Sequence, residues 1–107
     1  MPAVVIHCTC PDDATADRIA TALVEERLAA CVQRLPGLRS TYRWEGRVEQ
    51  ADEVLLLIKT AAARIPQVFD RVRSLHPHDV PELLALDVRD ASPAYLDWVL
   101  AQSTDDA

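Results

Sequence analysis

The order of apolar and polar positions along the chain predicts alternating strands and helices. Residues 4–9 are mostly β-branched and apolar and are followed by Pro11, which predicts a strand buried on both faces except at its C-terminal end. Apolar residues then recur at helical spacing, which predicts a helix that runs to about Leu28. Asp12 and Asp13 lie where a side-chain cap and a negative charge both stabilise a helix start.

A long β-hairpin follows this helix. From 32 to 44 apolar and polar residues alternate, with a break at Pro36-Gly37, and Glu45-Gly46 then supplies a turn before a second strand over 48–58. The first of these strands would be about 43 Å long if extended. A globule of this chain length has a diameter of about 34 Å, so we expect the hairpin to project from its own sheet. Its unpaired edges predict strand pairing with another subunit.

The C-terminal part of the chain repeats the alternation. Helical spacing predicts a helix over 63–75, and a short apolar strand follows over 83–88. Ser92 and Pro93 then match an N-cap and a first helical residue, and residues 103–107 are expected to fray. The order is βαββαβ with an added C-terminal helix. This order predicts an α+β fold, the ferredoxin-like sandwich, in which the long hairpin pairs with another subunit.

Length and charge restrict the class of protein. A chain of 107 residues predicts a single domain (1–107), with an ordered core over about 3–102. The net charge of -6 argues against a nucleic-acid partner. The start has no basic leader and no apolar run approaches the length of a bilayer span, so we expect no membrane partner and a cytoplasmic location. An odd number of cysteines, three, predicts reduced thiols.

The candidate chemistry favours binding over catalysis. With only two glycines the chain has no phosphate-binding loop, and no serine lies on a nucleophile elbow, so we expect no enzyme. Cys8 and Cys10 are two residues apart on an extended segment, so both thiols can face the same way, as can His76 and His78 on either side of a proline. Thiolate and imidazole together suit copper or zinc.

Each candidate residue also has an ordinary structural interpretation. Cys8 and Cys31 are residues of a type that is often buried in cores, and His76 and His78 follow a helix end where an imidazole is favourable without a metal. Lys59 is either an edge residue that extends to solvent or an anion-binding group. These alternatives remain open at the level of sequence.

Several separated motifs occur in a characteristic order along the chain. They are Leu28-Ala29-Ala30-Cys31-Val32, the segment from Pro36 to Gly46, Leu57-Ile58-Lys59-Thr60, His76-Pro77 with Pro81-Glu82-Leu83, and Tyr95-Leu96-Asp97-Trp98. Together they resemble the CutA divalent-cation-tolerance family, and the match runs from about Val4 to Leu100. The resemblance implies a ferredoxin-like homotrimer that assembles through the long hairpin and is linked to tolerance of copper and other divalent cations.

The resemblance also implies metal ligands. The family's copper ligands correspond here to Cys8 and His76, with copper the implied metal and no cofactor required for folding. The sequence departs from the family at Leu75, where the copper-binding pattern has a second histidine, and at His78, where the family usually has tyrosine.

The sequence leaves a second function open. This alternative is a signalling or adaptor trimer, similar to PII-type regulators, that binds a small anionic ligand in clefts between subunits. The residues expected in that cleft are Trp44, Glu53, Lys59 and Glu82.

Overall fold

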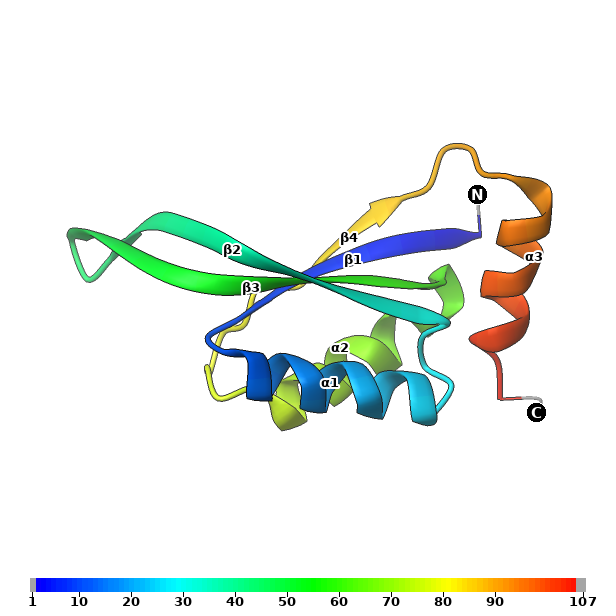
Figure 1. Cartoon of the computed structure of the whole chain (residues 1–107), viewed down its shortest axis with the longest axis horizontal. Helices are drawn as coiled ribbons and strands as arrows, with labels where there is room; N and C mark the ends of the chain where they lie inside the picture. Colours follow the sequence, from blue (N-terminus) through cyan, green and yellow to red (C-terminus); the bar gives the residue numbers. More distant parts are fainter. Residues whose placement is uncertain (1, 106–107) are drawn as a thin grey trace.

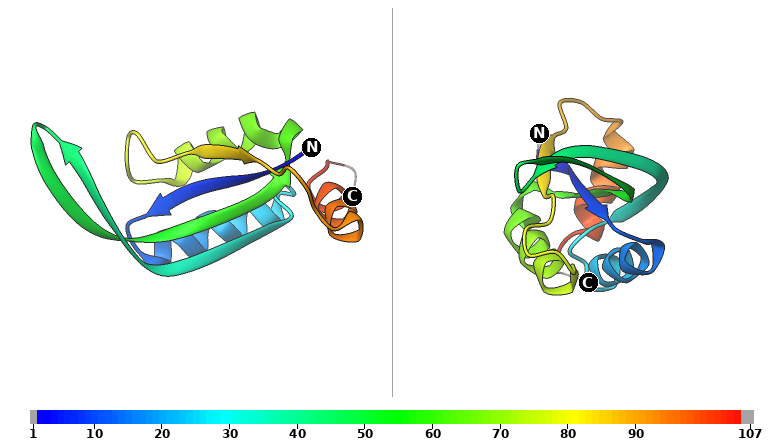
Figure 2. Two further views of the ribbon diagram at one scale, coloured as in Figure 1. Left: turned by 90° about the horizontal axis from the view of Figure 1, so that it is seen from above. Right: turned by 90° about the vertical axis from the view of Figure 1, so that its left-hand side faces the viewer.

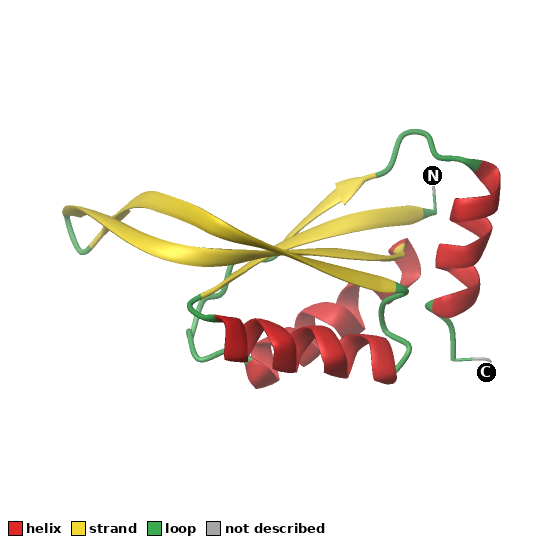
Figure 3. Ribbon diagram, viewed as in Figure 1, coloured by secondary structure: helices red, strands yellow, loops and turns green. Residues whose placement is uncertain are grey.

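The computed structural model describes residues 2–105 and shows one antiparallel four-stranded sheet with the order β2-β3-β1-β4. Helices α1 and α2 cover one face, and α3 lies at the end of the sheet away from the hairpin tip (Figures 1 and 3). This is the ferredoxin-like arrangement with an added helix that the sequence predicts. The elements are β1 (Ala3–Cys10), α1 (Asp13–Glu25), β2 (Cys31–Trp44), β3 (Arg47–Ala61), the 3-10 helix η1 (Ala62–Arg64), α2 (Ile65–Leu75), β4 (Leu84–Asp87) and α3 (Pro93–Gln102).

Strand β1 is buried on one face only, so the prediction of a strand buried on both faces was wrong. Its side chains alternate between fully buried and partly exposed positions from Val4 onward. The reason is that α1 and α2 cover one face of the sheet, whereas α3 packs on the other face only near Ala3. The side chains on the face that α1 and α2 cover form the main core, which includes Val4, Ile6, Cys8, Cys10, Ile19, Leu23, Leu56, Ile58, Val68 and Val72.

The hairpin of β2 and β3 projects from the sheet, as the strand length predicts. The two strands pair as far as Trp44 and Arg47, whereas β1 pairs with β3 only between Val54 and Ala61. The molecule is therefore 44 Å long but only 26 and 22 Å in its other dimensions (Figure 2). Gly46 has a φ of +78° at the tip, a backbone conformation that glycine adopts without strain. The register shift between Leu35 and Leu38 matches the predicted break.

The first helix begins as predicted but ends earlier. The carboxylate of Asp12 accepts a hydrogen bond of 2.8 Å from the N–H of Thr15, which caps the helix start. The helix ends at Glu25 because Arg27 takes a left-handed φ of +60°. Leu28 therefore packs against the core from a loop, with its N–H bonded to the carbonyl of Leu23.

The end of the chain differs from two predictions. Ser92 precedes α3, but its side chain makes no capping hydrogen bond. Ser103 is 2% exposed and bonds in two directions, because its Oγ accepts from the N–H of Ala61 and donates to the carbonyl of Val99. Residues 103–105 are thus fixed to the fold instead of frayed, and 106–107 lie outside the described residues.

Candidate metal and ligand site

Two segments far apart in sequence bring three soft metal ligands together. Strand β1 places Cys8 and Cys10 on the same buried face, and α2 ends at Leu75 so that His76 turns back toward β1. The candidate ligand atoms of Cys8, Cys10 and His76 all lie within 4.8 Å of one another. The predicted pair of Cys8 and His76 is therefore adjacent in space. The spacing predicts that Cys10 faces the same way, but its place in this cluster depends on where α2 ends, which the sequence pattern alone does not give.

Both ring nitrogens of His76 have backbone partners. Nε2 lies 2.8 Å from the carbonyl oxygen of Thr9, and Nδ1 accepts a hydrogen bond of 3.1 Å from the N–H of His78. An oxygen partner requires a proton on Nε2, and an N–H partner requires a lone pair on Nδ1. The ring is therefore the neutral Nε2–H tautomer, and it links β1 to the segment after α2.

The two thiols form a hydrogen-bonded pair with opposite pKa shifts. The bond to Cys10, together with burial, raises the pKa of Cys8 far above its ordinary range, and the carboxylates of Glu82 and Glu53 act in the same direction. The same bond lowers the pKa of Cys10. The Sγ of Cys8 also donates to the carbonyl of Thr9 at 3.8 Å. Cys31, for which a core position was predicted, lies instead opposite Lys59 on the partly exposed face of the sheet.

A cleft of about 720 Å³ lies beside this cluster, between the hairpin and the segment before β4. Its lining includes Trp44, Glu53 and Glu82, three of the four residues predicted to form a ligand cleft. Asp79 adds a further carboxylate, whereas that of Asp52 is paired with Arg39 at 3.2 Å. The described lining contains no lysine or arginine. Thr9 and His78 belong to the cleft as well, so it borders the Cys8, Cys10 and His76 cluster. The charge of the cleft favours a cation over an anion.

Lys59 does not lie in this cleft. Its Nζ is 3.4 Å from the hydroxyl of Tyr95 and 5.4 Å from the centre of that ring, and the ring of Trp98 lies 5.7 Å from that of Tyr95. Lys59 therefore contacts α3. The sequence places it on β3 correctly, but only the packing of α3 shows which side chain it meets.

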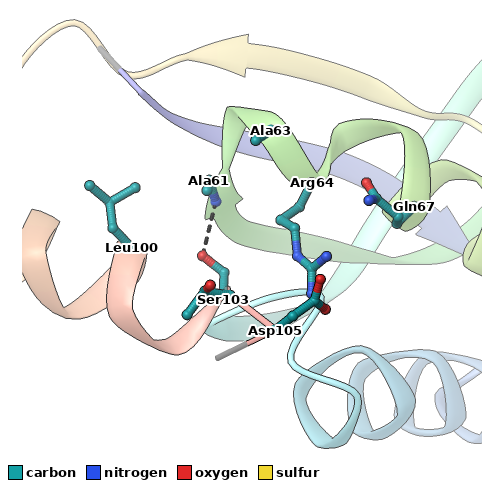
Figure 4. Close-up of a pocket in the computed structure, with 8 residues that line it drawn as sticks. Ala61, Ala63, Arg64, Gln67, Leu100, Ser103 and Asp105 are labelled. Atoms are coloured by element: carbon teal, nitrogen blue, oxygen red, sulfur yellow. Dashed lines mark hydrogen bonds and ion pairs between the residues drawn. The ribbon is translucent and has the colours of Figure 1, made fainter. Parts of the chain in front are cut away.

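A second cavity, of about 390 Å³, lies where η1 and α2 meet the end of α3 (Figure 4). Arg64 is 7% exposed there and donates to the carbonyl of Arg27 and to the carboxylate of Asp105, the latter at 2.8 Å. These bonds tie the start of α2 to the end of the chain. We assign this cavity a structural role.

The comparison with known proteins identifies the family. A family model described as CutA1 divalent ion tolerance protein matches residues 4–102. The chain belongs to the CutA1 divalent ion tolerance family. It is 50% identical over 95 residues to the divalent-cation tolerance protein CutA of Thermus thermophilus, covering 89% of this chain and 92% of that protein.

Solved structures of CutA proteins share the fold. The crystal structure of CutA from Xylella fastidiosa has a TM-score of 0.95 and 43% identity, covering 97% of this chain and all of that one. The divalent cation tolerance protein CutA of Archaeoglobus fulgidus, which is named periplasmic, has a TM-score of 0.93 and 32% identity, covering 95% and 99% of the two chains. Within residues 2–105, no helix is both long and apolar enough to cross a bilayer.

Proposed function

We propose that this CutA protein is a homotrimer that binds copper or a related divalent ion through Cys8 and His76. The observation that carries the proposal is the convergence of a buried thiol pair and a buried imidazole within 4.8 Å. Thiolate and imidazole are the ligands that copper and zinc prefer. The acidic cleft beside the cluster supports the same proposal, because carboxylates attract the cation that the cluster would hold.

A binding role fits the chemistry of the cluster better than catalysis. A cysteine nucleophile must be reached by its substrate, but the side chain of Cys8 is fully buried. The metal-free cluster also has partners for its polar atoms, since Cys8 donates to the carbonyl of Thr9 and His76 bonds to two backbone groups. We therefore propose that folding requires no metal.

The open face of the sheet supports the homotrimer. Leu84 and Leu86 on β4 are 57% and 47% exposed, and they pair with His7 and Val5, whose side chains lie on the face away from α1 and α2. Trp44 and Val48 near the hairpin tip are more exposed still. Covering such apolar area is a common reason for self-association, and cyclic symmetry would let each hairpin meet a neighbouring subunit.

The thiols and the net charge support proposals about the location of the protein and its partners. Free thiols at Cys8, Cys10 and Cys31 are typical of a reducing compartment, so we propose a cytoplasmic location. The net charge of -6 supports the absence of a nucleic-acid partner, and we propose no membrane partner.

The alternative function, a PII-like trimer that binds a small anion, has one favourable observation. The cleft beside Trp44, Glu53 and Glu82 is large enough for a small molecule. Its carboxylates would repel an anion, however, and Lys59, the expected cationic group, lies against α3. The structure therefore favours the metal function.

A titration panel separates the two functions. Purified protein is titrated by calorimetry with copper, Zn²⁺ and a set of nucleotides, and affinity and stoichiometry are measured for each. The metal function predicts saturable copper binding with one ion per chain and no nucleotide binding. Saturable nucleotide binding without copper binding would instead support the anion cleft.

A further inference from the structure

The ligand cluster contains a donor that the Cys8 and His76 pair does not include. Cys10 is fully buried, as is Cys8, and antiparallel pairing with Val54 and Leu56 fixes both cysteines on the core face of β1. We infer that Cys10 is a third metal ligand and that the completed site selects monovalent copper over divalent ions. This inference rests on the proposed function, because it concerns the same site.

The number and softness of the ligands point to the monovalent ion. Two sulfurs and one imidazole nitrogen make a soft set, which favours Cu(I) over ions that prefer oxygen. Zn²⁺ in a closed protein site needs a full tetrahedral set of ligands, or a water in the open position. Within residues 2–105 the cluster contains no fourth histidine, cysteine or carboxylate, and both cysteines are 0% exposed to solvent. Cu(I) is stable with fewer ligands than Zn²⁺.

The burial of the cluster also favours Cu(I) over divalent ions. The free energy needed to transfer an ion from water into a protein interior rises steeply with its charge. A divalent ion therefore loses more hydration free energy on entering this cluster than Cu(I) does. The carboxylates of Glu53 and Glu82 lie outside the cluster, in the cleft, where they can attract either ion without ligating it.

The imidazole must give up one backbone contact to ligate a metal. If Nδ1 binds, the hydrogen bond from the N–H of His78 is lost, and if Nε2 binds, its proton and the contact with Thr9 are lost. To ligate a metal, the two thiols lose their protons, and Cys8 also gives up its hydrogen bond of 3.8 Å to the carbonyl of Thr9. Thiolate is a softer ligand than imidazole, so Cys10 should matter to Cu(I) affinity as much as Cys8.

Competition under anaerobic conditions tests this inference. The parent, Cys8→Ser, Cys10→Ser and the control Cys31→Ser are each titrated with Cu(I) against a chromophoric Cu(I) chelator. Changes in the partners of metal ligands cost about 10–100-fold in affinity, so loss of a ligand should cost at least about 100-fold. We expect that loss for Cys8→Ser and for Cys10→Ser, and no change for Cys31→Ser. The parent should also bind Cu(I) more tightly than Cu(II) or Zn²⁺.

The outcomes separate the inference from the function on which it rests. If Cys10→Ser binds Cu(I) like the parent while Cys8→Ser does not, Cys10 is not a ligand and the proposed function stands. Tighter binding of Cu(II) or Zn²⁺ by the parent would overturn the choice of monovalent copper alone. If the parent binds none of these metals, the proposed function itself fails.

A spectroscopic measurement on the parent avoids the risk that Cys10→Ser folds poorly. X-ray absorption of the Cu(I)-loaded parent should show two sulfur neighbours and one nitrogen neighbour. A single sulfur neighbour would overturn the role of Cys10 whatever the variant does. Cys10→Ala, which buries no hydroxyl, serves as the second variant, and its circular dichroism is compared with that of the parent.

Discussion

The imidazole of His76 and the carbonyl of Thr9 are 2.8 Å apart, and this contact joins the end of α2 to the end of β1. Thr9 lies between Cys8 and Cys10 in the chain, so the contact that positions the ring also brings it to the two thiols. The observed position of the ring is therefore the one expected both if His76 only stabilises the fold and if it also binds a metal. Measurements that separate these two roles are the informative ones.

His78 offers such a separation, because it assists His76 through its backbone. Its N–H donates to His76 Nδ1, and the two rings are 4.8 Å apart, but the ring of His78 is exposed and does not belong to the ligand cluster. We predict that His78→Ala keeps copper affinity within about threefold, since it leaves the backbone donor in place. His76→Ala should reduce affinity by at least about 100-fold. Equal losses in the two variants, measured by chelator competition, would show that His78 is itself a ligand.

Ser103 should matter to stability far more than Ser92. Replacing Ser103 by alanine leaves the N–H of Ala61 without its partner, and a buried unsatisfied donor costs about 1–3 kcal/mol. Ser92→Ala is the matched control, because the Ser92 side chain makes no capping bond and its loss should cost less than about 0.5 kcal/mol. Urea unfolding at equal protein concentration measures both changes. Equal midpoints for the two variants would contradict the assigned role of Ser103.

The cap of α1 should make stability depend on pH at the acidic end. The N–H of Thr15 holds the pKa of Asp12 below its ordinary value of 3.8. A carboxyl group whose pKa is lower in the folded state stabilises the fold above its unfolded pKa, and this contribution is lost as pH falls through the folded pKa. Asp12→Asn keeps an acceptor but has no charge. We predict that its deficit in urea midpoint relative to the parent is present at pH 7 and disappears below the folded pKa.

A deficit that is constant over this pH range would show that the charge of Asp12 contributes nothing. Asp12→Ala provides the control, since it removes the acceptor as well as the charge. Its deficit should persist at every pH at which the parent is folded.

Assembly can be tested on the open face of the sheet. Sedimentation equilibrium should give a mass about three times the 11.9 kDa of one chain. Leu86→Glu places a charge on the exposed part of β4, on the face away from α1 and α2, so it should shift the mass toward that of a single chain. Val24→Glu is the control, because Val24 is similarly exposed, at 44%, but lies on α1. A parent with the mass of one chain at micromolar concentration would contradict the trimer.

The sequence predicts the strand and helix order because hydrophobic periodicity reports which residues share a face. It predicts the hairpin turn for a similar local reason, since Glu45 and Gly46 both have the positive φ that this turn requires. The sequence pattern gives wrong predictions where the conformation of a residue depends on contacts with a segment far away in the chain. Leu28 appears helical by spacing but packs from a loop, and Ser103 appears frayed but bonds to Ala61, more than 40 residues away.

In the candidate site, too, the sequence predicts what depends on local spacing and does not predict what depends on distant contacts. The spacing of Cys8 and Cys10 shows that their thiols share a face, because side chains alternate along a strand. The nearness of His76 depends on the packing of α2 below the sheet, and here only the family resemblance pointed to it. The contact of Lys59 with Tyr95 likewise depends on the docking of α3, which the sequence pattern does not give.

The double variant Cys8→Ser/His76→Ala tests the central claim most directly, with Cys31→Ser as the control for general thiol chemistry. Copper affinity and stoichiometry are measured for each protein after circular dichroism has shown a parent-like fold. We predict one tightly bound copper per chain in the parent and in Cys31→Ser, and no specific binding in the double variant. If the double variant binds copper as tightly as the parent, Cys8 and His76 do not form the metal site of this protein.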